Sequence, residues 1–92
     1  MLSILIPIYN YNVYPLVLEL HEQCMTLRIS FEILCQDDGS TINFSENNQI
    51  NKLHGGQYLS NKKNLGRSSN INALAEISKF DYLLILEADA FP

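Results

Sequence analysis

Three short apolar segments are spread along the chain, separated by longer polar or amphipathic stretches, and a fourth short segment is partly apolar. The apolar segments are Leu2–Ile8, Phe31–Gln36 and Tyr82–Leu86, and the partly apolar one is Gln57–Ser60. Most of their residues are aliphatic, β-branched or aromatic, and Tyr82–Leu86 has no polar position at all. Continuous apolar runs of this length are typical of strands that are buried on both faces of a parallel sheet. We therefore predict four strands.

Two of the intervening stretches have the spacing of amphipathic helices. The first helix is predicted at about Val13–Thr26, where Asn12 offers a cap and Pro15 suits the first turn. Its apolar positions are Leu16, Leu20, Cys24 and Leu27. The second, Ser68–Ser78, places Ile71, Leu74, Ala75 and Ser78 on one face. Residues 42–56 are polar and rich in Asn, with room for a short helix. This order of elements predicts one α/β domain, with helices on both faces of a parallel sheet.

Composition agrees with a small globular domain. The 92 residues are 47% hydrophobic and 17% charged, and ten acidic against six basic residues give a net charge of −4. This charge argues against a nucleic-acid partner. No apolar run approaches the roughly twenty residues of a membrane-spanning helix, and the first residues lack the basic start of a secretory signal. We therefore expect a cytoplasmic protein without a transmembrane segment.

The cysteines and histidines form no metal or redox pattern. Cys24 and Cys35 are not in CxxC spacing, and neither His21 nor His54 belongs to an HExxH pattern. We expect both cysteines to be reduced and to face the core, and both histidines to lie at the surface.

Polar clusters follow three of the predicted strands. These clusters are Tyr9-Asn10, Asp37-Asp38-Gly39-Ser40 and Glu87-Ala88-Asp89, and Asn64-Leu65-Gly66-Arg67 lies just before the second helix. Ligands of such sheets bind beyond the carboxyl ends of the strands, so the fold would gather these clusters at one crevice. Plainer interpretations remain: an ordinary turn at Asp37-Asp38, and a solvated loop for the cations Lys62, Lys63 and Arg67.

The usual phosphate-binding loops are missing, because neither GxGxxG nor a P-loop follows the first strand. A divalent cation held by carboxylates is the usual substitute. Glu87 and Asp89 would supply two acids on the same side of an extended segment. We therefore expect a divalent cation as a cofactor, held by the carboxylates of Asp89 and Glu87.

The clusters together resemble four motifs of the family 2 glycosyltransferases, which have the GT-A fold. In chain order, the segments that resemble the family's hIPhYN, DDGST, NxGR and hhhLDADA motifs are Ile4–Asn10, Asp37–Thr41, Asn64–Arg67 and Leu84–Ala90. The resemblance covers the whole chain but only the front half of the family's domain. It implies that residues 1–92 are a nucleotide-sugar-binding half-domain, a truncated GT-A domain with a Rossmann-like sheet in the order 3-2-1-4.

The resemblance also implies roles at the nucleotide. Tyr9 would lie against the nucleobase, and Pro7 would shape the exit of the first strand. Asp38, on a turn that faces solvent, would accept a hydrogen bond from a ring N–H of the base. Asp37 would support that turn, and Gly39 would let the backbone pass close to the nucleotide.

At the phosphates, the resemblance implies that Asp89 would coordinate the Mn²⁺ or Mg²⁺ ion that bridges the diphosphate, and that Glu87 would contact the metal or the ribose. The ion would stabilise negative charge on the leaving nucleoside diphosphate. Arg67, with Lys62 or Lys63, would meet the phosphates or the acidic motif.

Three departures from the family pattern affect these implications. Glu87 stands where the DxD motif begins with Asp, and its side chain is one methylene longer. Ile71 stands where an arginine usually precedes Asn72, which leaves open whether Arg67 compensates for the lost cation. The family's catalytic base lies well downstream of the DxD motif, and Asp81 precedes its strand at the opposite edge of the sheet. No catalytic residue is therefore assigned.

The resemblance thus implies an inverting glycosyltransferase that moves a sugar from a UDP- or GDP-sugar to an unknown hydroxyl acceptor. Residues 1–92 would hold the donor and metal site only and would be inactive alone. The alternative is a stand-alone nucleotide- or metal-binding module that acts with a partner chain. A nucleotidyltransferase ranks last, because its glycine-rich loop is missing. Since Tyr82–Leu86 would lie at an open sheet edge, we also expect a homo-oligomer formed through this strand.

Overall fold

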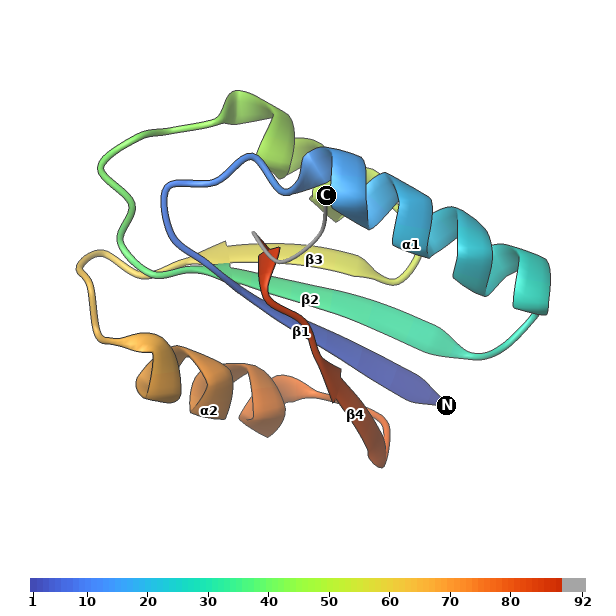
Figure 1. Cartoon of the computed structure of the whole chain (residues 1–92). Coiled ribbons are helices and arrows are strands. Elements are labelled where there is room, and N and C mark those ends of the chain that lie inside the picture. Colours follow the sequence, from blue (N-terminus) through green and yellow to red (C-terminus); the bar gives the residue numbers. More distant parts are fainter. Residues whose placement is uncertain (89–92) are drawn as a thin grey trace.

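The computed structural model describes residues 1–88 and is built on a four-stranded parallel sheet (Figure 1). The strands β1 to β4 lie in the order β3-β2-β1-β4 and cover Leu2–Ile8, Phe31–Asp37, Gly56–Ser60 and Tyr82–Ile85. The predicted α/β class, the Rossmann-like sheet and the strand order are confirmed. The predicted bounds differ from those of β2, β3 and β4 by one residue each.

Helices cover both faces of this sheet (Figure 1). The helix α1 (Tyr14–Leu27) and the short 3-10 helix η1 (Ser45–Lys52) lie on one face, and α2 (Arg67–Ile77) lies on the other. The helix for which residues 42–56 left room is therefore η1. Pro15 lies in the first turn of α1 as predicted, but the residue at the N-cap is Val13. Asn12 instead accepts a hydrogen bond through Oδ1 from the backbone N–H of Tyr14, at 3.2 Å.

The main core lies between the sheet and the α1 face. Alternate residues of β1 and β2 meet side chains from α1 and η1 there, and its buried members include Ile4, Ile6, Ile33, Val17 and Ile50. A smaller cluster of Leu5, Leu34 and Leu74 lies between the sheet and α2. Both faces of β1 and β2 are therefore covered, which accounts for the unbroken apolar character of these two strands.

Both cysteines are free and buried, as predicted. Burial raises the pKa of the Cys24 thiol and of the Cys35 thiol. The prediction for the histidines holds for His54, which is exposed, but is wrong for His21, which is partly buried. His21 lies one turn before Cys24 on the inner side of α1, and its ring packs edge-on against Phe31 with the centroids 5.6 Å apart.

The strand β4 lies at the edge of the sheet, and the segment just before it is held by hydrogen bonds to the buried carboxylate of Glu32. Glu32 accepts hydrogen bonds from the Ser3 hydroxyl at 2.6 Å and from the backbone N–H of Lys79 at 2.5 Å. Ser3 Oγ in turn accepts one from the backbone N–H of Phe80 at 3.3 Å. These bonds fix the turn between α2 and β4 against β1 and β2. Within residues 1–88, no helix has the length and apolar character that crossing a membrane requires.

Candidate functional site

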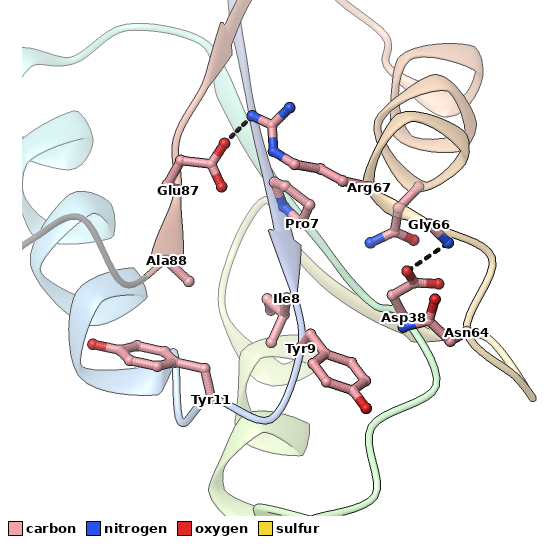
Figure 2. Close-up of a pocket in the computed structure, with 11 residues that line it drawn as sticks. Pro7, Ile8, Tyr9, Tyr11, Asp38, Asn64, Gly66, Arg67, Glu87 and Ala88 are labelled. Atoms are coloured by element: carbon pink, nitrogen blue, oxygen red, sulfur yellow. Dashed lines mark hydrogen bonds and ion pairs between the residues drawn. The ribbon is translucent and has the colours of Figure 1, made fainter.

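A pocket of about 380 Å³ opens at the carboxyl end of the sheet (Figure 2). The segments after β1, β2 and β4 meet there with the start of α2. The residues that line it include five to which the sequence analysis gave a role at the nucleotide or the metal, namely Pro7, Tyr9, Asp38, Arg67 and Glu87. The topology therefore brings to one place residues from four distant segments of the chain, as parallel strands that end at one edge require.

Asp38 is buried in the wall of this pocket and is only 5% exposed. Its Oδ1 accepts hydrogen bonds from Asn61 Nδ2 at 3.1 Å and from the backbone N–H of Leu65 at 2.7 Å. Its Oδ2 accepts one from the backbone N–H of Gly66 at 2.9 Å (Figure 2). The expectation that Asp38 faces solvent is wrong, because the loop before α2 folds over it. Of the roughly four acceptor positions of a carboxylate, one on Oδ2 remains for a ligand.

Asp37 and Gly39 shape the same turn without lining the pocket. Asp37 accepts hydrogen bonds from the Ser40 hydroxyl and from the Ser40 backbone N–H, so it supports the turn. Gly39 has a φ of +70°, and a Cβ there would come within 2.4 Å of the backbone carbon of Lys63. In the structure, Gly39 therefore lets the loop before α2 pass close to the turn after β2.

Arg67 and Glu87 form an ion pair across the pocket (Figure 2). Arg67 is the first residue of α2, and Glu87 lies two residues beyond the end of β4. Their side chains are 58% and 41% exposed, respectively. Ile71 lies one helical turn after Arg67, so the cation that contacts the acidic motif comes from Arg67. Lys62 and Lys63, by contrast, are exposed and do not line the pocket.

The family model of glycosyl transferase family 2 matches residues 3–92. This match covers β2, β3, β4 and all of β1 except Leu2, and it includes every residue that lines the pocket. The chain belongs to this family. A search of the curated proteins finds no match. Family 2 glycosyltransferases use nucleotide-sugar donors, so membership assigns the chain to that general activity.

The start of α2 is held in this glycosyltransferase chain by an amide network that the sequence analysis missed. Asn70 is 1% exposed, donates through Nδ2 to the Gln36 carbonyl at 2.7 Å and accepts from Asn61 Nδ2 at 3.0 Å. Gln36 Nε2 donates to Asn61 Oδ1 at 2.7 Å. The available signal was that Asn70 lies four residues before the buried Leu74 and so shares its helix face.

The loop after β1 is also fastened to the turn after β2. Asn10, which has a φ of +51°, accepts hydrogen bonds through Oδ1 from the backbone N–H groups of Thr41 at 2.9 Å and Ile42 at 3.1 Å. Its own backbone N–H donates to Ser40 Oγ at 2.7 Å. The neighbouring Tyr9 stays 50% exposed, so its ring is presented at the pocket. Tyr11, which the sequence analysis did not single out, also lines it.

The expected metal-binding pair lies partly outside the described residues, because Asp89 is not among them. Glu87 is described, and its carboxylate contacts Arg67. Over residues 1–88, no three His, Cys, Asp or Glu side chains are grouped so that they could hold a metal ion. Of the expected pair, the described part of the chain therefore contains Glu87 alone.

Proposed function

We propose that the pocket binds the nucleoside diphosphate part of a nucleotide-sugar donor, and that the reaction served is transfer of the sugar to a hydroxyl acceptor with inversion. One juxtaposition carries this proposal: an exposed Tyr9 ring, the buried Asp38 carboxylate and the Arg67–Glu87 ion pair line one pocket. The aromatic ring would stack on the nucleobase, and the carboxylate would accept a hydrogen bond from a ring N–H of that base. The charged pair would meet the diphosphate and its metal ion.

At the base end, the remaining acceptor position of Asp38 favours one kind of nucleobase. Uracil carries a single ring N–H between two carbonyl groups, whereas guanine presents a ring N–H beside an amino group and needs two acceptors. Adenine has no N–H on its six-membered ring. With three hydrogen bonds already accepted by Asp38, we expect preference for UDP over GDP and weak binding of ADP.

At the phosphate end, we expect donor binding to separate the Arg67–Glu87 ion pair, so that each side chain takes a new partner. Arg67 would turn from Glu87 to the phosphate oxygens, for which its guanidinium is well suited. Glu87, with Asp89, would then be free to hold Mn²⁺ or Mg²⁺ together with those oxygens. The ion would supply stabilisation of the charge that develops on the leaving nucleoside diphosphate.

The described residues support donor binding more than the transfer step. Inverting transfer needs a base that removes the proton of the acceptor hydroxyl. Asp38 is occupied by the backbone of the loop before α2, and Glu87 would be occupied by the metal ion once the donor is bound. We therefore propose that this chain binds the donor without turning it over alone. The alternative is a binding module that lends its site to a partner chain. A bisected enzyme would regain transfer when the downstream half of the domain is added, whereas a binding module would not.

Titration calorimetry tests the proposal, with UDP, GDP and ADP each measured in the presence and absence of Mn²⁺. We expect weak binding in the order UDP, GDP, ADP, strengthened by Mn²⁺. Glu87→Gln should remove most of the gain from Mn²⁺, whereas Glu76→Gln, an exposed site on α2, should leave it unchanged. Equal affinity for the three nucleotides, or a gain that Glu87→Gln leaves intact, would contradict the assignment.

A further inference from the structure

A side-chain amide at the end of β3 links the wall of the pocket to α2. Asn61 directly follows β3, and its backbone N–H donates to the Asp37 carbonyl at 2.8 Å. Its Nδ2 donates to Asp38 Oδ1 at 3.1 Å and to Asn70 Oδ1 at 3.0 Å. Its Oδ1 accepts from Gln36 Nε2 at 2.7 Å. Asn61 does not line the pocket, so its effect on a bound ligand must pass through these partners.

The orientation of the Asn61 amide is fixed by two groups that can only accept hydrogen bonds, the Asp38 carboxylate and the Gln36 backbone carbonyl. Asn70 donates through Nδ2 to that carbonyl at 2.7 Å, so its Oδ1 is turned toward Asn61. The N–H₂ group of Asn61 must therefore face Asp38 and Asn70, because turning the amide over would set its oxygen against two other oxygens. Both N–H groups of Asn61 are thus used within the protein.

These bonds determine which oxygen of Asp38 can accept from a ligand. Oδ1 accepts from Asn61 and, at 2.7 Å, from the Leu65 backbone N–H, which together occupy its two lone-pair directions. Oδ2 accepts one bond, from the Gly66 backbone N–H at 2.9 Å. The carboxylate cannot turn without breaking these bonds. The position that remains for a ligand therefore stays on Oδ2.

We propose that Asn61 is a positioning residue for the nucleobase: by holding Oδ1, it makes Asp38 present the free position of Oδ2 to a ring N–H. This inference rests on the proposed function, because it takes Asp38 as the acceptor of the base. Hydrogen bonds weaken steeply when they are poorly aligned, and an acceptor that is aligned before binding loses less freedom on binding. Gln36 and Asn70 act one step further away, because they hold Asn61.

Titration calorimetry with UDP and with ADP, both in the presence of Mn²⁺, tests this role. The two nucleotides share the diphosphate and differ in the base, and only uracil has a ring N–H to donate to Asp38. The ratio of their affinities therefore reports this contact. Asn61→Asp keeps the shape of the side chain and the acceptor for Gln36, but turns an oxygen instead of an N–H toward Asp38. We expect the UDP-to-ADP affinity ratio to fall at least about fivefold.

Asn51→Asp is the matched control. Asn51 also holds β3, because its Oδ1 accepts from the Tyr58 backbone N–H at 2.8 Å, but it lies on η1 and does not line the pocket. This variant should leave the ratio unchanged. Asn61→Leu is the second test variant, since it removes the N–H without adding a charge beside Asp38, and it should lower the ratio as well.

The ratio separates positioning from a purely structural role. A variant that is only less stable binds both nucleotides less, in proportion to its folded fraction, and its ratio does not change. Circular dichroism measures that fraction. Folded Asn61 variants with the wild-type ratio would therefore overturn the inference. Failure of both Asn61 variants to fold would assign Asn61 to the fold and would overturn it too.

The same titrations distinguish this inference from the proposed function. A wild type that binds UDP and ADP equally would remove Asp38 from the base, and both would fail. A ratio that falls in Asp38→Asn but not in either Asn61 variant would keep the proposed function and overturn the role of Asn61 alone.

Discussion

Asp38 and Gly66 are joined by a hydrogen bond of 2.9 Å from the Gly66 backbone N–H to Asp38 Oδ2. This bond connects the turn after β2 to the residue just before α2, across the wall of the pocket. The carboxylate that the family resemblance assigns to the nucleobase therefore also holds two sides of its own binding site together. Substitutions at Asp38 should consequently affect the fold as well as the ligand.

Asp38→Asn should lower the free energy of unfolding by about 2–3 kcal/mol. In the wild type the backbone N–H groups of the loop before α2 donate to a carboxylate, whereas in the variant one of them would face the N–H₂ group of an amide. Urea denaturation measures the change. Asp81→Asn is the control, since Asp81 is exposed and should alter stability by less than about 0.5 kcal/mol. Equal stability of wild type and Asp38→Asn would mean that these backbone bonds contribute little.

Gly39→Ala and Gly66→Ala separate steric overlap from backbone strain. Both glycines have positive φ, +70° and +96°, so alanine should cost about 1–3 kcal/mol at either position. A Cβ at Gly39 would also overlap the backbone of Lys63 and Asn64, whereas nothing lies within 4 Å of one at Gly66. Thermal unfolding should therefore rank Gly39→Ala as the less stable variant. The reverse order would contradict the tight packing of this turn.

Asn70→Ala should destabilise the chain by about 1–3 kcal/mol, because it leaves the Gln36 carbonyl and an Asn61 N–H without their partner. Asn72→Ala, at an exposed position of the same helix, should be close to neutral. If chemical denaturation finds the two variants equally stable, the amide network is not what holds α2.

Stability should fall in alkaline solution, and Cys35 should contribute to the fall. Burial raises the pKa of its thiol above the ordinary value of 9.0, so the unfolded chain loses this proton first. The contribution is fully present below pH 9.0 and is lost as the pH rises toward the folded-state pKa, by up to about 1.4 kcal/mol per pH unit.

Urea denaturation at several pH values measures this slope. Cys35→Ala should lower stability at every pH, because it removes buried volume, but should flatten the alkaline slope. The pKa of Tyr58 is also raised by burial, so some slope should remain above its ordinary value of 10.0. A slope that Cys35→Ala leaves unchanged would show that the thiol is not its source.

Most of the fold was predictable because its signals are local. Continuous apolar runs located the strands, and apolar residues three or four apart located α1 and α2. The order of the strands was a different matter, because nothing in the pattern of a strand specifies its neighbour. It followed from the resemblance to a family. The polar clusters were brought to one edge by the rule that ligands of parallel sheets bind beyond the carboxyl ends of the strands, and the structure places their described residues there.

The side-chain environment of the site was less predictable, because distant segments create it. A DDGS turn has the composition of an exposed turn, and Asp38 is buried only because a loop more than twenty residues away covers it. Asn70 shares a helix face with Leu74, but its hydrogen bonds depend on Gln36 and Asn61, which come from other segments of the chain. His21 was misplaced for the same reason, since Phe31 of another element packs against it.

The position of β1 in the sheet has a consequence for how the chain folds during synthesis. Leu2 opposes Phe31 on one side and Tyr82 on the other, which are separations of 29 and 80 residues. Contacts between residues so far apart in sequence slow folding, because a long loop must close before they form. Of the described strands, β1 is synthesised first, although it lies inside the sheet. Its side toward β4 has no partner until Ile85 has been synthesised, and until then Leu2–Ile8 is an unpaired apolar edge that chaperones and other chains can bind.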